Sequence, residues 1–288
     1  MPSFTLSSPG AIAFKIGPLA IRGYALAITF GFLVATWAST AIAKRRDINP
    51  DKFLDASMLV FLGGIVGARL YFAALSWQTF DNAFEVFQIW RGGLSIHGGI
   101  IGGVIAGYLY CRASKMSFLN GADIVGAVAP LAQAIGRWGN FFNSEAFGGP
   151  VSESFPIKLF IPEASRPQGL QQYQYFQPTF LYESLWDLLI FFALYFFFFD
   201  KFKKYPGMTF LAYLLLYSVG RAIIEPLRTD SIMVGAVAAP LAVSAGLIAA
   251  AAVGMLLLWR YYESKKGNRP DEQGLNQNQG EQPLNNGK

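Results

Sequence analysis

The chain has 288 residues, of which 53% are hydrophobic and 16% aromatic, while only 14% are charged. Because soluble domains usually carry about a quarter charged residues, this composition excludes an ordinary water-soluble protein and indicates an integral membrane protein. The single cysteine, Cys111, and the single histidine, His97, exclude a disulfide framework and argue against a zinc site.

The N-terminal residues 1–23 mix Ser, Pro and Gly with short apolar groups, and they predict an extracytoplasmic or interfacial arm rather than a cleavable signal peptide. Residues 24–260 then contain seven apolar runs, each close to the ~20 residues that a helix needs to cross a bilayer. The predicted spans are 24–43, 56–75, 94–110, 121–135, 179–199, 208–224 and 233–259.

Three further segments separate or follow the spans. Residues 76–93 place aromatic side chains at three- and four-residue steps, which predicts an amphipathic helix lying in the membrane interface. Residues 141–178 are polar and rich in Pro and Gln, and they predict a small extracytoplasmic head segment. Residues 261–288 are rich in Asn, Gln and Gly, and we expect them to form a disordered cytoplasmic tail.

The basic residues predict the orientation. The net charge is +5, and most of the 23 lysines and arginines follow the first, third, fifth and seventh spans. Cytoplasmic loops of membrane proteins carry an excess of Lys and Arg, so this distribution reports topology rather than nucleic-acid binding. We therefore predict an all-α integral membrane protein with seven transmembrane helices, the N-terminus outside, the C-terminus in the cytoplasm and a small extracytoplasmic segment between spans four and five.

In this orientation, unusual polar residues gather at the outer ends of six spans. They are Tyr24, Arg69, Tyr71, His97, Arg137, Asn140, Glu145, Tyr182, Glu183, Arg221, Glu225 and Arg228. Several fixed cations at the depth of lipid phosphates predict a site for an anionic headgroup, with carboxylates orienting the guanidinium groups.

Simpler interpretations exist for single members of this set. An arginine at a span end is more often an interfacial anchor, but its place in a convergent set favours function for Arg137 and Arg221. His97 is either a helix cap or a functional group, and the glycines beside it favour function. Tyr24 fits an aromatic belt equally well, and Arg69 fits a structural role better than a functional one.

At these residues the sequence resembles the bacterial prolipoprotein diacylglyceryl transferases. The resemblance lies in Gly-Pro-Leu-Ala-Ile-Arg-Gly-Tyr at 17–24, Gly-Ala-Arg-Leu-Tyr at 67–71, Gly-Leu-Ser-Ile-His-Gly-Gly at 93–99, Gly-Arg-x-Gly-Asn-Phe-x-Asn-x-Glu at 136–145 and Pro-Thr-Phe-Leu-Tyr-Glu at 178–183. Arg221, Glu225 and Arg228 follow with the family's spacing. One departure is Gln177, where many members have His.

The resemblance implies transfer of the diacylglyceryl group from phosphatidylglycerol to the lipobox cysteine of a prolipoprotein, at the outer leaflet of the bacterial inner membrane. It implies no metal and no organic cofactor. The implied catalytic residues are His97, Arg137, Arg221 and Glu225, and the implied phosphatidylglycerol-binding residues are Arg137, Tyr24, Asn140, Glu145, Gly148 and Arg228.

Within this set, we assign the two arginines Arg137 and Arg221 to the phosphate, because a departing phosphate needs its charge neutralised. His97 is the candidate general base for the substrate thiol, and Glu225 is the alternative base. We expect Glu145 and Glu225 to orient arginines, and Asn140 and Tyr24 to position the headgroup.

Two other functions compete with a transferase. A transporter or channel for an anionic lipid or solute predicts polar groups along a whole pathway, whereas here they stop at one depth. An intramembrane aspartyl protease needs a carboxylate dyad. Asp187 lies in an outer half, while Asp55 and Asp123 lie near the inner edge, so the sequence predicts no dyad.

Overall fold

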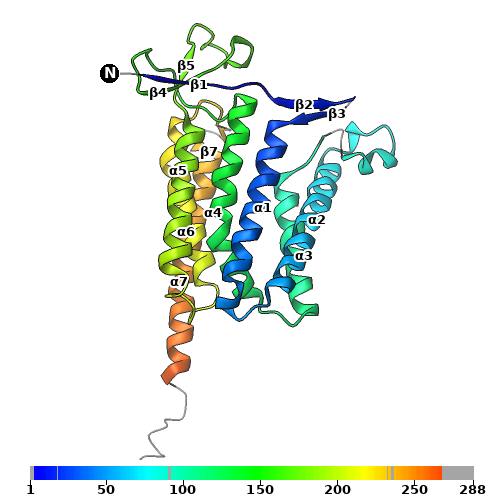
Figure 1. The fold of residues 1–288 in the computed structure, drawn as a ribbon, viewed down its shortest axis with the longest axis vertical. Coiled ribbons are helices and arrows are strands. Elements are labelled where there is room, and N and C mark those ends of the chain that lie inside the picture. The colour runs from blue at the N-terminus through cyan, green and yellow to red at the C-terminus, as the bar shows by residue number, and fades with distance from the viewer. Residues whose placement is uncertain (1–2, 18, 90–91, 232, 235–236, 268–288) are drawn as a thin grey trace, which may run out of the picture.

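The computed structural model describes residues 3–17, 19–89, 92–231, 233–234 and 237–267, and within them seven long helices run side by side (Figure 1). The helices are α1 (Gly23–Ala43), α2 (Pro50–Leu75), α3 (Ile96–Ala113), α4 (Phe118–Asn143), α5 (Thr179–Phe192), α6 (Met208–Ile224) and α7 (Ala239–Gly267). Six of them, all except the 18-residue α3, are long and apolar enough to cross a membrane. The prediction of a helical integral membrane protein is confirmed.

Several predicted boundaries are wrong. Helix α4 continues eight residues past the predicted end at 135, so the polar residues of its last two turns lie on a helix. Two short strands, β6 (Met233–Val234) and β7 (Val237–Ala238), precede α7. Helix α7 then continues to Gly267, so residues 261–267 are helical rather than disordered. The remainder of the predicted tail, 268–288, lies outside the described residues.

Helices α2 and α3 form a closely packed pair that depends on glycine. A Cβ atom on Gly67 would lie 2.8 Å from the Cα atom of Gly102, and a Cβ atom on Gly102 would lie 2.9 Å from the Cα atom of Gly67. Neither distance leaves room for a side chain, so the two backbones meet directly. The glycines of α3 therefore pack this helix directly against α2.

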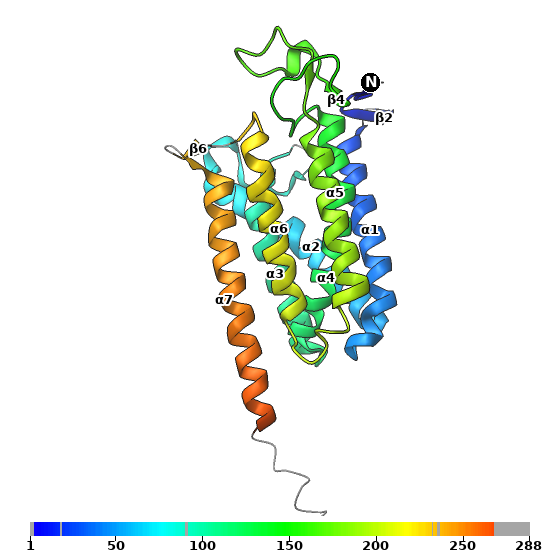
Figure 2. The same ribbon diagram turned by 90° about the vertical axis from the view of Figure 1, so that its left-hand side faces the viewer.

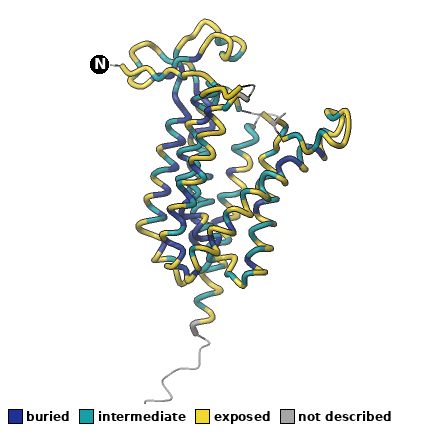
Figure 3. Tube along the Cα trace, turned by 45° about the vertical axis from the view of Figure 1, so that its right-hand side comes forward, coloured by how far each residue is buried: buried dark blue, intermediate teal, exposed yellow. Residues whose placement is uncertain are grey.

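Much of α2, α3 and α7 is exposed or half-buried, as Figure 3 shows, and many of their exposed side chains are apolar. In α2 and in α7, only 11% of the most apolar 18-residue stretch is buried inside the protein. Large exposed side chains on these helices include Leu62, Val66, Ile101, Val104 and Leu257. A continuous apolar surface of this kind matches a bilayer core and would be unfavourable in water.

The outer end carries a small β-structured head above α4 and α5 (Figure 2). Strand β1 (Phe4–Ser7) pairs in parallel with β4 (Ile157–Phe160), and β4 pairs antiparallel with β5 (Tyr175–Phe176). Phe176, Phe180 and Ile161 are completely buried beneath this sheet. The N-terminal segment is thus not one arm, because β1 belongs to the head while β2 (Ile12–Ile16) and β3 (Leu19–Arg22) form a hairpin leading into α1.

The predicted interfacial helix over 76–93 is also wrong in form. Two short 3₁₀ turns, Trp77–Thr79 and Ala83–Phe87, replace it. They fold around the guanidinium group of Arg69, which donates to the carbonyl oxygens of Glu85 and Val86 (2.7 Å each), Gln88 (3.3 Å), Gly93 (3.0 Å) and Gly92. Arg69 therefore organises the segment after α2, which supports its structural role; Trp90 and Arg91 lie outside the described residues.

We expect Arg69→Met to loosen this segment, because five backbone carbonyl oxygens lose the guanidinium donors that Arg69 supplies. Chymotrypsin should then cleave after the exposed Phe84 and Phe87 at least ~10-fold faster than in the unmodified protein. The matched control is Arg112→Met, a change at an exposed arginine of the opposite end. Equal cleavage rates in the two variants would contradict the role assigned to Arg69.

The inner end is closed by a buried arginine that the sequence placed among solvated loop cations. Arg46 is 1% exposed, donates to the carbonyl oxygen of Phe199 (2.6 Å) and to Thr209 (2.9 Å), and lies 3.7 Å from Asp123. At the surface beside it, a hydrogen bond from Arg45 lowers the pKa of Asp200. These contacts join the turn after α1 and the segment after α5 to the start of α6.

Candidate active site at the outer end of the bundle

A single carboxylate, Glu183, lies at the centre of the outer polar cluster. It sits in the second turn of α5 and is 3% exposed. Arg137 from α4 approaches its Oε2 atom at 2.8 Å, and Arg221 from α6 pairs with its Oε1 atom. Arg228, from the segment after α6, reaches the same Oε1 atom at 3.4 Å. Three guanidinium groups from three segments therefore share one buried carboxylate.

Arg137 is held by residues of both neighbouring helices. In addition to Glu183, its Nε atom lies 3.8 Å from Asp187 Oδ2, one turn deeper along α5. Its Nη2 atom donates to the hydroxyl group of Tyr217 on α6 at 3.4 Å. The guanidinium plane is thus fixed on three sides, which a flexible ammonium group cannot reproduce.

Arg221 and Arg228 each have a second carboxylate partner. Arg221 pairs with Glu225 one turn further along the chain, and Glu225 also accepts a hydrogen bond from Ser231 at 2.8 Å. Arg228 forms a bidentate pair with Asp230 at 2.9 and 3.0 Å. Although α6 ends at Ile224 and Arg228 is in an extended conformation, Arg228 still joins the cluster. The expected pairing of Glu225 with an arginine is confirmed.

Backbone contacts fasten the chain after α4 to the chain after α6. Gly148 forms a β-bridge with Arg228, Gly149 donates to the carbonyl oxygen of Leu227 at 3.2 Å, and Thr229 donates to that of Phe147 at 3.2 Å. A Cβ atom on Gly148 would lie 2.8 Å from the carbonyl oxygen of Leu227, so a side chain at this position would separate the two segments. Gly148 therefore helps to hold Arg228 in the cluster, because it allows the two backbone segments to pair closely.

Glu145 has different partners from those expected. Asn140 and Asn143, from the last turn of α4, both donate to its Oε1 atom, at 2.9 and 3.3 Å. No arginine of the described chain lies within ion-pair distance of Glu145, so its expected role in orienting an arginine is wrong. Tyr24 lies nearby on α1, where its ring packs against Gly139 so closely that an added Cβ atom would lie 2.8 Å from it.

His97 stands apart from the arginines. It occupies the first turn of α3, is exposed, and has its ring centroid 6.2 Å from that of Tyr71 on α2. Among the described residues, none forms a hydrogen bond or an ion pair with its imidazole. The structure thus brings together Arg137, Arg221, Arg228 and Glu225, and leaves His97 as a free imidazole on a different helix pair.

The arginines and glutamates of the cluster form two layers that differ in exposure. The side chains of Arg137, Arg221 and Arg228 are 18%, 14% and 13% exposed, whereas those of Glu183 and Glu225 are 3% and 1% exposed. The carboxylates therefore lie behind the arginines. Each guanidinium group has five N–H bonds, of which the protein contacts described above use two or three, so donors remain for an anion such as a phosphate.

Sequence reasoning missed the importance of Glu183. It had placed Glu183 at the correct depth but gave it no role, and it considered Asp187 only as a protease candidate. The available signal was their four-residue separation, which puts two carboxylates on one face of an apolar helix facing Arg137. Tyr217 carried no comparable signal, because its partner Arg137 lies on another helix. Asn143 and Asp230 each pair with a residue two positions away, Glu145 and Arg228, a spacing that marks no common helix face.

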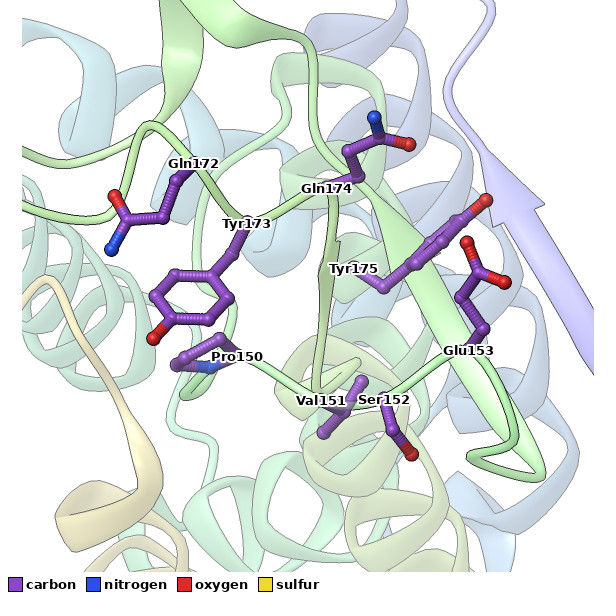
Figure 4. Close-up of a pocket in the computed structure, with 8 residues that line it drawn as sticks. All are labelled: Pro150, Val151, Ser152, Glu153, Gln172, Tyr173, Gln174 and Tyr175. Atoms are coloured by element: carbon purple, nitrogen blue, oxygen red, sulfur yellow. The ribbon is translucent and has the colours of Figure 1, made fainter.

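Two hollows lie outside the arginine cluster. One, about 630 Å³, lies in the head and holds none of the predicted site residues (Figure 4). Its lining consists of Pro150, Val151, Ser152, Glu153, Gln172, Tyr173, Gln174 and Tyr175. The other, about 490 Å³, lies between α1, α4 and α5, where Phe30, Ile135 and Trp138 give it an apolar lining. An apolar hollow facing the bilayer suits hydrocarbon rather than a headgroup.

Comparison with known proteins places these residues in context. A family model described as "Prolipoprotein diacylglyceryl transferase" matches residues 11–258. The chain is similar to proteins named "Phosphatidylglycerol--prolipoprotein diacylglyceryl transferase" from three bacteria. The Gloeobacter violaceus protein is 46% identical over 90% of this chain and 97% of its own length. The Thermotoga maritima protein is 43% identical over 88% of this chain and 86% of its own length. The Nostoc sp. protein is 42% identical over 91% of this chain and 93% of its own length.

Proposed function

The chain belongs to the prolipoprotein diacylglyceryl transferase family, and from this premise we propose that it transfers the diacylglyceryl group of phosphatidylglycerol to the lipobox cysteine of a prolipoprotein. This transfer is the first step of bacterial lipoprotein maturation. The observation that carries the proposal is the convergence of Arg137, Arg221 and Arg228 on the buried Glu183 at one end of a membrane bundle.

The reaction is a substitution at carbon. The substrate's thiol sulfur forms a bond to the terminal glyceryl carbon, and the bond between that carbon and the phosphate oxygen breaks. The electron pair of the broken bond stays with glycerol phosphate, which leaves, and the thiol proton passes to a base. The only cysteine of the chain, Cys111, is buried in the last turns of α3. This placement favours direct attack by the substrate over a cysteine-linked intermediate.

The arginines stabilise the leaving group in this proposal. Charge on the phosphate rises as the carbon–oxygen bond breaks, and preorganised donors act on such charge without reorganising. The carboxylates behind them hold Arg137 and Arg221 in place before the lipid arrives, so little ordering remains when it binds. Arg228 completes this wall from the segment after α6.

We propose His97 rather than Glu225 as the base that receives the thiol proton. Glu225 is 2% exposed, with one oxygen on Arg221 and the other on Ser231, so it has little capacity to accept a further proton. The imidazole of His97 is exposed and has no hydrogen-bond or ion-pair partner among the described residues. A general base within reach of the reacting group contributes about 10²- to 10⁴-fold to the rate.

For His97→Gln we expect a decrease in kcat of at least ~100-fold, because the thiol proton loses its acceptor. The measurement is the initial transfer rate with saturating lipid and peptide. Near-normal turnover of His97→Gln would remove His97 from the mechanism.

The membrane arrangement forms part of the proposal. We propose that α3 is the seventh span, shortened by its glycines and paired with α2, and that the head and the N-terminus lie outside. The site then faces the outer leaflet of the inner membrane, where exported prolipoproteins present their cysteine. The basic residues at the opposite end support this orientation.

One assay tests the transferase against a transporter for an anionic lipid. Purified protein is incubated with phosphatidylglycerol and a peptide containing a lipobox cysteine, and the peptide mass is measured. We expect a gain of one diacylglyceryl group and release of glycerol phosphate. No mass gain, combined with protein-dependent movement of the lipid across liposome membranes, would favour the transporter.

A further inference from the structure

The segment that follows α4 turns a carboxylate back toward the end of that helix. Ser144 and Ala146 adopt left-handed conformations, with φ of 54° and 56°, on either side of Glu145. Such conformations are strained for residues other than glycine and tend to occur at functional sites. The backbone nitrogen of Glu145 also donates to the carbonyl oxygen of Asn140 at 3.1 Å. Glu145 is therefore held in a defined position, at the expense of backbone strain.

This carboxylate is unlike the others in the cluster. Glu183, Asp187, Glu225 and Asp230 all pair with arginines, whereas the partners of Glu145 are two neutral carboxamides. Both carboxamides donate to the same oxygen, Oε1. The second oxygen, Oε2, accepts no hydrogen bond from any described residue. The position thus presents a negative charge with an available acceptor at the edge of an anion site.

A second acceptor lies beside it. The Oδ1 atom of Asn143 is buried and has no hydrogen-bond partner among the described residues. The contact with Glu145 shows which atom of the Asn143 carboxamide is the oxygen. A carboxylate only accepts hydrogen bonds, so the Asn143 atom that lies 3.3 Å from Glu145 must be the NH₂ group, and the unpartnered atom is the oxygen. A buried acceptor without a partner is costly and indicates a missing donor.

We propose that Glu145 and Asn143 together bind the vicinal diol of the glycerol headgroup of phosphatidylglycerol, an inference that rests on the proposed function. The two hydroxyl groups supply the two donors that the site lacks. Asn140 lies three residues from Arg137 on α4, about 4.5 Å along the helix axis. This offset suits a headgroup whose phosphate contacts the arginines while its glycerol extends outward. Asn140 acts as a positioning residue, since its donor is spent on Glu145.

Recognition of a diol by these two acceptors predicts selectivity for lipids whose headgroup carries both hydroxyl groups. A site built to hydrogen-bond a hydroxyl group rejects the analogue that lacks it, because its own acceptors then stay unpaired. We therefore expect kcat/KM for phosphatidylglycerol to be roughly 10- to 100-fold higher than kcat/KM for phosphatidylpropanol with the same acyl chains. In Glu145→Gln, which puts a donor in place of the free acceptor, this ratio should fall to about 3-fold or less.

The same recognition is measurable without turnover. Glycerol phosphate should raise the melting temperature of the unmodified protein more than propyl phosphate does, and Glu145→Gln should respond equally to both. Asn143→Ala provides a second variant, with an intermediate loss of discrimination. Glu163→Gln, an exposed site in the head, is the matched control and should keep full discrimination.

The outcomes separate the two proposals. Equal use of both lipids by the unmodified protein, or an unchanged ratio in both the Glu145 and the Asn143 variants, would overturn diol recognition while leaving the transferase intact. Absence of transfer with either lipid would overturn the proposed function, and the melting-temperature comparison would still decide whether the diol is recognised.

Discussion

Glu183→Gln should abolish most activity and destabilise the protein, although the change alters one atom. Three guanidinium groups depend on this carboxylate, and removing one partner of a buried ion pair costs about 3–5 kcal/mol because the remaining charge stays buried. We expect a decrease in kcat/KM of at least ~100-fold, since the arginines also lose their fixed positions. The measurements are transfer rate with phosphatidylglycerol and thermal unfolding in detergent.

The control for this change is Glu163→Gln, which removes the same charge from an exposed position in the head. It should leave both rate and unfolding temperature nearly unchanged. If the Glu183 variant behaved like this control, the shared ion pairs would be irrelevant to both function and stability. Loss of stability with full activity would restrict Glu183 to a structural role.

Arg137→Lys should lower kcat by roughly 10²- to 10³-fold while keeping the positive charge. An ammonium group is a single point donor, whereas the guanidinium group contacts Glu183, Asp187 and Tyr217 in different directions and still has N–H groups for a phosphate. Loss of one preorganised donor to a developing oxyanion has an effect of this size. Initial rates with saturating lipid and peptide provide the test.

Arg112→Lys, at an exposed position of the opposite end of the bundle, is the matched control. It makes the same chemical change far from the cluster, so its rate should stay within about twofold of the unmodified protein. Comparable rates in the two lysine variants would mean that Arg137 serves as a membrane anchor rather than as a phosphate ligand.

Sequence patterns predicted the parts of this fold that depend on apolar length. The helices follow from long apolar runs, and the close contact of α2 with α3 follows from the glycine spacing around Gly67 and Gly102. The clustering of Arg137, Arg221 and Arg228 followed from topology, because alternate spans return polar residues to the same side. The three arginines of the cluster were thus predictable from the sequence alone.

The errors arose where contacts between distant segments decide the structure. Nothing local shows that Glu145 receives two carboxamides instead of an arginine, since this depends on left-handed turns at Ser144 and Ala146. Arg46 looked like a solvated loop cation, but Thr209 and a carbonyl from the end of the fifth helix bury it. The segment after α2 has helical spacing, yet the carbonyl contacts to Arg69 impose 3₁₀ turns.

The pairing of β1 with β4 sets an order on biogenesis. Phe4 lies opposite Ile157 in this sheet, so β1 finds its partner only after α1 to α4 and the first part of the head have been synthesised. Until then β1 remains an unpaired strand edge. Closure of the head is therefore a late, long-range event, and it depends on correct placement of the four helices between the two strands.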